Sequence, residues 1–371
     1  MIGGRATPAG TRRYAERFPE LLAAGHFREV GGLWLSSIGL GTYLGEATAA
    51  RDRDYEEAVA AALAAGCNVI DSAINYRHQR SERAVGRALA RAIERAVAAR
   101  DEVFLSTKGG YLPFDGEQPG DAGDYLRRTY LASGLVNPEE LVAGCHALAP
   151  RFLSDQLGRS RANLDVATVD LYYLHNPETQ LAEAPRGVFE ARLGAAFTQL
   201  EAEAASGTIA SYGIATWDGL RGRDAGESLH LERVAALARA AAGSADTRFA
   251  AVQLPVNLAL PEAVVSPTQE LDGASVPALV AARRLGLHAF ASASILQGRL
   301  ARRLPPEIAE AFPGLRTDAQ RALQFSRSAP GVAVALVGMA SAEHVRENLE
   351  LASIPPAGSE AFAALFGGAA P

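Results

Sequence analysis

The sequence predicts an α/β fold, a (β/α)8 TIM barrel with an N-terminal β-hairpin and long loops after strands 3 and 7. Eight short apolar runs alternate with longer runs rich in Ala, Leu, Glu and Arg, which indicates eight βα units. The short runs are continuously apolar, as in parallel strands that are covered on both faces. The first turn, GLGTYLG at residues 39–45, lacks the G-x-G-x-x-G spacing of a doubly wound open sheet. Closing eight such units therefore gives a barrel.

The elements are expected in strict alternation along the chain. The predicted strands lie near residues 37–40, 68–70, 103–107, 169–174, 210–215, 250–254, 288–291 and 333–337. The predicted helices lie near residues 54–65, 81–98, 138–158, 188–205, 230–242, 275–285, 317–328 and 341–351. Residues 1–26 are expected to form an N-terminal extension, and residues 27–371 a single barrel domain. In FREVGGLWL (27–35), a Gly-Gly pair between two apolar runs predicts a hairpin that closes the barrel bottom.

Two long segments interrupt the alternation, at about residues 109–136 and 293–316. Both follow strands, and in a barrel the loops after strands lie on the catalytic face. The first contains several aromatic residues, namely Tyr111, Phe114, Tyr125 and Tyr130. This composition favours an ordered lid or substrate wall over a disordered linker.

The composition argues against several classes of protein. With 48% hydrophobic and 21% charged residues, the chain can bury a large core. The net charge of -6 and the scattered arginines argue against a nucleic-acid partner. Two cysteines are too few for a disulfide framework. No apolar run is long enough for a signal peptide or a membrane span, so we expect a cytoplasmic protein without a membrane partner. The oligomeric state is left open.

A single lysine closes the third predicted strand. Lys108, in VFLSTKGG (103–110), is the only lysine in the chain, so 35 of the 36 Lys+Arg residues are arginine. An ammonium is a compact point charge whose pKa shifts readily on burial, which a guanidinium does not offer. A lysine at the end of an apolar strand is not ordinary surface, so this residue is a candidate catalytic group.

Three further polar residues stand at or just after consecutive strand ends. Asp71 ends the second predicted strand, Tyr76 follows it, and His175 ends the fourth. Each has a structural alternative, respectively a helix cap, half-buried packing and a core histidine. In a barrel, however, all of them converge with Lys108 on one mouth, where such residues are typically catalytic.

An Asp, a Tyr, a Lys and a His at one mouth form a proton-transfer device. The lysine, paired with the aspartate, stays charged, and its charge should lower the pKa of the tyrosine towards working pH. The tyrosine then protonates a carbonyl oxygen, or takes a proton from an alcohol in reverse, while the histidine holds the same oxygen. A guanidinium would not fit the space of the amine.

At this point the motifs, taken in order, resemble the aldo/keto reductase superfamily over residues 37 to about 351. The matching segments are GLGTYLG (39–45), NVIDSAINY (68–76), SER..G (81–86), VFLSTKGG (103–110), VDLYYLHNP (169–177), GTIASYGIA (207–215), VQLPVNL (252–258) and VGMASAEHVRENL (337–349). The resemblance implies that Tyr76 is the general acid/base and that His175 positions the carbonyl. It implies further that Asp71 orients Lys108, which tunes the tyrosine. Hydride would pass to an aldehyde or ketone from NADP(H), bound in extended form across the C-terminal face.

The resemblance also implies a set of cofactor-binding residues. They are Gly41, Thr42, Thr216, Gln253, Ser292, Gly298, Gly338, His344, Glu347 and Asn348. Gln253 matches the glutamine that binds the nicotinamide carboxamide in the family, and Glu347 and Asn348 match the adenosine-binding end of the last motif. No metal is expected.

Other cofactor positions depart from the family pattern. Ala215-Thr216 replaces a Ser-Asn pair, and Ser292 replaces the usual aromatic residue that stacks on the nicotinamide, although nearby Trp217 could supply a ring. Gly338 and His344 stand where many relatives keep Lys and Arg, the cations that read the 2′-phosphate. NADP(H) is the expected cofactor, with NAD(H) as the alternative.

The segment after Tyr76 is two residues longer than the usual family spacing. Arg77, His78 and Arg80 could face the pocket and favour an anionic or polyhydroxylated substrate. We favour instead a solvated loop that turns into the next helix, with Ser81 as its cap.

The leading hypothesis is thus an NAD(P)H-dependent oxidoreductase whose partner is a small carbonyl or alcohol. A sugar dehydrogenase that forms a lactone is one alternative. A cofactor-sensing regulatory protein, similar to the β subunits of voltage-gated potassium channels, is another. A metal-dependent hydrolase would need a His-x-His pair or carboxylate cluster at strand ends, which the sequence lacks.

Overall fold

Eight parallel strands close a barrel within the residues that the computed structural model describes, 1–222 and 228–366. In barrel order they are β3 (Ile38–Gly41), β4 (Val69–Asp71), β5 (Phe104–Gly109), β6 (Val169–His175), β7 (Ile209–Ala215), β8 (Phe249–Pro255), β11 (His288–Ser292) and β12 (Val332–Gly338). Every predicted strand coincides with one of these to within two residues. The predicted fold class, a (β/α)8 TIM barrel, is confirmed.

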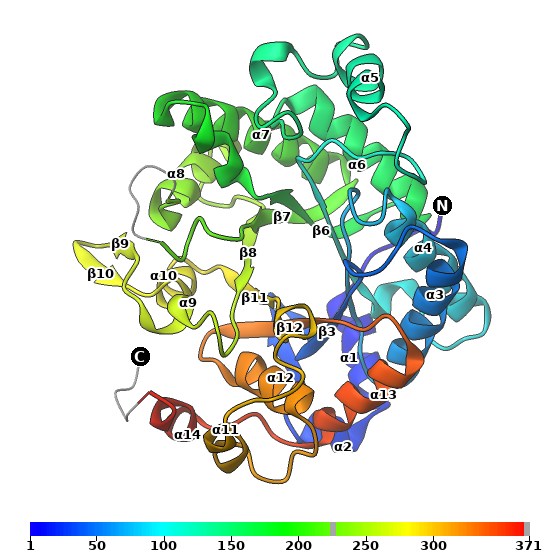
Figure 1. Ribbon diagram of the computed structural model, residues 1–371, viewed down its shortest axis with the longest axis vertical. Helices are drawn as coiled ribbons and strands as arrows, with labels where there is room; N and C mark the ends of the chain where they lie inside the picture. Colours follow the sequence, from blue (N-terminus) through cyan, green and yellow to red (C-terminus); the bar gives the residue numbers. More distant parts are fainter. Residues whose placement is uncertain (223–227, 367–371) are drawn as a thin grey trace.

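Helices surround the strands, as Figure 1 shows. The larger ones are α3 (Ala49–Ala64), α4 (Arg80–Glu94), α6 (Pro150–Leu164), α7 (Arg186–Ser206), α8 (Leu231–Ala242), α10 (Ala278–Arg284), α12 (Asp318–Ser328) and α13 (Ala342–Leu349). Short ones are α5 (Ala122–Leu126), α9 (Glu262–Val265), α11 (Pro306–Ala311) and α14 (Ser359–Ala364). Within the described ranges, no helix is long and apolar enough to cross a membrane.

Two helix predictions were partly wrong. The predicted helix 138–158 is helical only as a short 3-10 turn, Pro138–Glu140, and then from Pro150, where α6 starts. Between these two helical segments, His146 forms isolated β-bridges with Val142 and with Tyr111 of the loop after β5. Ala147 and Ala149 pack into a separate apolar cluster under that loop rather than along a helix. The predicted helix 275–285 begins instead with a hairpin, β9 (Gln269–Leu271) and β10 (Ala274–Val276), and α10 starts after Pro277.

The predicted hairpin is present as β1 (Phe27–Val30) and β2 (Leu33–Ser36). Its side chains Val30 and Leu35 pack into the barrel interior against residues such as Phe104 near the strand starts, so it closes the bottom as predicted.

The first residues pack against the barrel. They form α1 (Pro8–Glu16) and α2 (Pro19–Ala23). Tyr14 is fully buried and its hydroxyl donates to the carbonyl of Leu63, while the amide of Ala6 donates to Asp170. The division of the chain at residue 26 stays a prediction.

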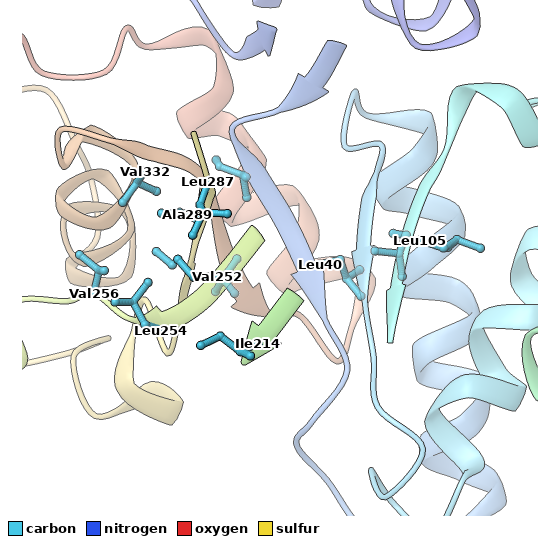
Figure 2. Packing of buried hydrophobic residues seen from close by; sticks show 14 of the residues in the cluster. Leu40, Leu105, Ile214, Val252, Leu254, Val256, Leu287, Ala289 and Val332 are labelled. Carbon is cyan, nitrogen blue, oxygen red and sulfur yellow. The ribbon is translucent and has the colours of Figure 1, made fainter. Parts of the chain in front are cut away.

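The core lies in two shells because strand side chains alternate. The outer shell fills the space between the strands and the helices. Figure 2 shows part of it, with Leu40, Leu105 and Ile214 on three of the strands. The inner shell fills the lower half of the barrel, where Phe104 and Phe290 stack with their ring centroids 5.9 Å apart. Apolar burial of this kind contributes about 1.5–3 kcal/mol for each large side chain, and it leaves only the upper mouth free for polar groups.

The loop after β5 is ordered, as predicted. Residues 109–136 contain α5 and a π-helical turn, Arg127–Leu131, and Tyr130 and Phe152 form the centre of a separate apolar cluster beneath them. The hydroxyl of Tyr130 donates to the carbonyl of Pro113. The loop after β11 carries a short turn, Leu296–Gly298, and α11.

Candidate active site

Alternation along the strands carries polar side chains into the upper mouth of the barrel. In β5, Phe104 belongs to the inner shell and Leu105 to the outer one. Lys108 lies four residues after Phe104 and therefore on the same inward face. The same alternation turns Asp71 of β4 and His175 of β6 inwards. The C-terminal strand ends thus bring three of the predicted residues together.

Lys108 is fully buried and paired. Its Nζ donates to Asp71 Oδ2 at 2.5 Å and to the carbonyl of Ser72 at 2.8 Å. The other carboxylate oxygen, Oδ1, accepts from Ser106 Oγ at 2.7 Å and from Gln253 Nε2 at 3.0 Å. Removing two charges from water is costly unless their hydrogen bonds are complete, and this network completes those of the carboxylate.

Tyr76 lies directly above this pair. Lys108 Nζ is 4.9 Å from the centroid of the Tyr76 ring. The rings of Tyr43 and His175 approach Tyr76 edge-on, with centroid distances of 5.0 Å and 5.8 Å. The four predicted residues of the proton-transfer device therefore meet at one place.

The electrostatics differ in one respect from the sequence-based expectation. Burial raises the pKa of Tyr76 above its ordinary value, and the opposing effect of the Lys108 charge does not cancel it. The expected net lowering of this pKa was wrong, because desolvation outweighs the ammonium. Burial would by itself lower the pKa of Lys108, but Asp71 and Tyr76 outweigh it and the pKa is raised. Burial, helped by the Lys108 charge, lowers the pKa of His175 well below its ordinary value. At neutral pH the site therefore holds a charged lysine, a protonated tyrosine and a neutral histidine.

A cavity of about 440 Å³ opens over these groups. Its lining includes nine of the predicted site residues, Gly41, Thr42, Asp71, Tyr76, His175, Thr216, Gln253, Ser292 and Gly338. No arginine or lysine side chain lines it among the described residues. The described ranges also contain no group of three or more His, Cys, Asp or Glu that could hold a metal ion.

A model of the aldo/keto reductase family matches residues 37–268. The chain belongs to the aldo/keto reductase family. No curated protein sequence matches it closely enough to be compared with it.

Solved aldo/keto reductases share the fold at low sequence identity. An aldo-keto reductase from Klebsiella pneumoniae in complex with NADPH is 20% identical, with a TM-score of 0.60 over 92% of this chain and 95% of that one. The glycerol dehydrogenase from Gluconobacter oxydans is 18% identical, with a TM-score of 0.64 over 93% and 95%. A holo aldo-keto reductase from Bacillus halodurans is 18% identical, with a TM-score of 0.61 over 92% and 95%. Family and fold together identify the chain as an aldo/keto reductase-type oxidoreductase.

The residues that the family resemblance places at the nicotinamide only partly keep the family chemistry. Gln253 lines the cavity, and because its Nε2 donates to Asp71, its side-chain oxygen is left as the group for a ligand amide. The Thr216 hydroxyl is already used, since it donates to Glu178 Oε1 at 2.7 Å and accepts from the amide of Gly219. Ser294, which also lines the cavity, has a buried hydroxyl with no partner among the described residues. The cavity therefore retains acceptor and donor groups that suit a carboxamide.

Several residues of the predicted set do not line the cavity. Lys108 lies behind Asp71 and Tyr76, and Gly298 ends the short turn after β11. His344 is exposed on α13, where its amide donates to the Ser341 hydroxyl. Glu347 and Asn348 follow on the same helix. Their roles in this aldo/keto reductase stay predictions.

The structure also adds further lining residues that were not predicted as catalytic or cofactor-binding residues. They are Tyr43, Leu44, Asn75, Tyr111, Asn176, Ala293, Ser294, Ile295, Gln297, Leu336 and Val337. Most follow a strand end by a few residues, which is the signal that could have found them. Trp217, proposed as a source of an aromatic face, lines the cavity and is 36% exposed.

The two glycines after Lys108 are required by close packing. A Cβ on Gly109 would lie 2.0 Å from the Tyr172 hydroxyl. Gly110 has φ +136° and a Cβ there would lie 2.9 Å from His146 Nε2.

His146 lies behind His175. Its Nε2 donates to the carbonyl of His175 at 2.8 Å, and burial lowers the pKa of His146 to about 4. This neutral histidine supports His175 from behind, and sequence reasoning missed it because residues 138–158 were read as a helix.

The basic residues after Tyr76 turn away from the cavity. Arg77 Nη2 and Arg80 Nη2 bind the two carboxylate oxygens of Asp52 at 2.5 and 2.6 Å. An anionic substrate therefore finds no guanidinium from this segment. The ring of His78 lies against Phe114, with the ring centroids 5.5 Å apart. The cap prediction for Ser81 was wrong, because Gln79 occupies the N-cap of α4 while the Ser81 hydroxyl donates to the carbonyl of Thr42.

Proposed function

We propose that this aldo/keto reductase uses NADP(H) to reduce a small uncharged aldehyde or ketone, with Tyr76 as the general acid. The observation that carries the proposal is the buried Lys108–Asp71 pair beneath the Tyr76 ring, at the floor of a cavity that also contains His175. The bound nicotinamide would supply the hydride. The chain supplies the proton, the orientation of the carbonyl and the exclusion of water.

Each residue of the site has a defined part in the proposed reaction. The raised pKa of Tyr76 keeps its proton at neutral pH, so its hydroxyl can donate to the carbonyl oxygen and protonate the forming alkoxide. The positive charge of Lys108 stabilises the tyrosinate left behind. Neutral His175 can donate a hydrogen bond from a ring N–H to the same oxygen. Asp71 keeps the lysine charged and in place.

An uncharged substrate is proposed because no arginine or lysine side chain lines the described cavity. Exposed Tyr43 and Trp217, respectively 53% and 36% exposed, offer apolar faces at the rim. Oxidation of an alcohol or a sugar by the same groups would be the reverse reaction, and it would need Tyr76 deprotonated to take the proton and the oxidised nicotinamide to take the hydride.

NADP(H) is proposed over NAD(H). The Klebsiella pneumoniae relatives were crystallised with NADPH or NADP. In this chain, a cation from α3 reaches the segment after β12, since Arg51 Nη1 donates to the carbonyl of Ala340 at 3.4 Å. That segment is where the family resemblance places recognition of the 2′-phosphate, so Arg51 could take the part of the cations that are missing at Gly338 and His344.

A fluorescence titration of the purified protein with NADPH and with NADH tests the cofactor proposal. We expect micromolar binding of NADPH, with a change in nicotinamide emission, and at least tenfold weaker binding of NADH. A screen of uncharged carbonyls with the NADPH-loaded protein then tests the reaction. Folded protein that binds neither cofactor would refute the proposed function, and binding without turnover of any carbonyl would favour a cofactor sensor.

A further inference from the structure

Three consecutive residues directly after Tyr76 have left-handed backbones although none is glycine. Arg77, His78 and Gln79 have φ values of 49°, 57° and 70°. A left-handed conformation costs about 1–2 kcal/mol for each such residue. Strain of this size persists only where the surrounding structure fixes it, and it is typical of functional sites.

Arg77 is the strongest of the anchors that fix this turn. Its side chain is 1% exposed and its Nη2 binds Asp52 Oδ1 at 2.5 Å. Its Nε donates to the carbonyl of Glu46 at 2.9 Å, and its Nη2 also donates to the carbonyl of Thr48 at 3.2 Å. The guanidinium carbon lies 5.2 Å from the centroid of the Tyr55 ring. Arg77 therefore joins the turn to α3 and to the loop that precedes it.

The loop held by Arg77, residues 43–48, contributes Tyr43 and Leu44 to the lining of the active-site cavity. Tyr55 binds the same loop, since its hydroxyl donates to the carbonyl of Leu44 at 2.6 Å. At the start of the loop, Tyr43 places its ring edge-on against Tyr76 at 5.0 Å. These contacts return to their starting point. Tyr76 precedes Arg77 in the chain, the Arg77 side chain binds the 43–48 loop, and Tyr43 of that loop contacts the Tyr76 ring.

The other two residues of the turn attach to the loop after β5. The carbonyl of His78 accepts from the amide of Gly116 at 2.8 Å. The side chain of Gln79 donates to the carbonyl of Phe114 at 2.9 Å. The turn is thus held on both sides, but among the described residues of the turn only the side chain of Arg77 binds the 43–48 loop, whose Tyr43 touches the Tyr76 ring.

We propose that Arg77 is a positioning residue that sets the ring of Tyr76 relative to Lys108 by clamping the 43–48 loop. The inference rests on the proposed function of Tyr76 as the general acid. It also gives a reason for the two extra residues after Tyr76, which supply the turn that carries Arg77 to Asp52.

The chain offers a matched control for this proposal. Arg80 binds the same carboxylate, with Nη2 at 2.6 Å from Asp52 Oδ2, and donates to the carbonyl of Gly116 rather than to the 43–48 loop. In Arg77→Met, Asp52 keeps Arg80 as a partner, and the methionine can still cover the Tyr55 ring. In Arg80→Met, Asp52 keeps Arg77. Both variants should fold, and they differ in whether the loop is clamped.

Two measurements on the full-length protein separate a positioning role from a structural one. The first is hydrogen exchange of the amides of residues 43–48, which needs no turnover. The second is the pH dependence of kcat, with KM measured alongside. The titratable groups around the Tyr76 ring are Lys108, Asp71, His175 and Tyr43. The charge of Lys108 lowers the pKa of Tyr76, so moving the Tyr76 ring away from Lys108 should raise the pKa of Tyr76.

Arg77→Met should raise exchange in the 43–48 loop at least tenfold, lower kcat by about tenfold to a hundredfold with little change in KM, and move the alkaline limb of kcat to higher pH. Arg80→Met should change each of these less than about twofold. Unchanged exchange in Arg77→Met, or equal effects of the two variants, would overturn the proposal. If the wild type turned over no substrate while exchange still separated the variants, the clamp would stand and the proposed function would fail.

Discussion

At the scale of single residues, the site depends on the balance between burial and charge. Lys108 keeps its charge because Asp71 and the carbonyl of Ser72 replace water around its ammonium. The same burial acts on Tyr76 in the opposite sense and keeps the phenol protonated. Sequence reasoning could identify all four groups and their convergence, because strand ends meet at one mouth. It could not give the direction of the Tyr76 pKa shift, since that depends on the desolvation of the ring.

The raised pKa of Tyr76 has a consequence for the pH dependence of reduction. The proposed reaction needs the protonated form, so activity should be present below the pKa of Tyr76 and lost as the pH rises through it. Because this pKa lies above its ordinary value of about 10, kcat for carbonyl reduction should stay level across neutral pH and fall only in strongly alkaline solution. A steady-state profile checks this. A fall in kcat between pH 7 and 9 would contradict it.

At the scale of elements, the barrel prediction was confirmed for segments with a regular hydrophobic pattern. It was wrong for segments whose apolar residues pack within a loop. The strands could be found because their apolar runs are covered on both faces. Residues 141–149 have the composition of a helix, yet Ala147 and Ala149 fill the cluster around Tyr130. Most of the loop residues that line the cavity follow a strand end, so the sequence could place them at the mouth, but they follow no period, so it could not show which of them face the cavity.

The end of α4 offers a test of element-level reasoning. The amides of Ala96 and Val97 donate to the carbonyls of Ile93 and Ala92, a pattern that places Ala96 in a left-handed conformation with φ 54°. Glycine is preferred at this position, as Gly207 is after α7. Ala96→Gly should therefore raise the free energy of unfolding by about 0.5–1 kcal/mol.

Urea unfolding measures this difference, and Gly207→Ala provides the opposite control because it should be destabilising. A lower stability of Ala96→Gly would show that the backbone of this turn is not strained as described.

At the scale of the whole molecule, stability should depend on buried neutral histidines. His26 is fully buried, and its Nε2 donates to the carbonyl of Gly66. Burial lowers the pKa of His26 to about 3. The unfolded chain binds its proton near pH 6.5 and the folded chain only near pH 3. Protonation of this histidine therefore leaves stability unchanged at neutral pH and increasingly favours the unfolded chain as the pH drops from 6.5 towards 3.

For His26 alone, the loss should be about 1.4 kcal/mol for each pH unit below 6.5. Urea unfolding between pH 7.5 and 4.5 measures it. A His26→Gln variant cannot titrate here and can still donate to Gly66, so its stability should fall less steeply with acid by about this amount. Parallel slopes for the two proteins would show that His26 is charged, or exposed, in the fold.

The central claim is that Tyr76 gives the proton that accompanies hydride transfer. Its most direct test is a single-turnover measurement of NADPH oxidation by Tyr76→Phe and by the wild type, with a carbonyl found in the screen. Phenylalanine keeps the ring over Lys108 and removes only the hydroxyl. NADPH binding should therefore be unchanged within about twofold, while the rate of hydride transfer falls by about 10²–10⁴. A transfer rate within a few-fold of the wild type would contradict the account.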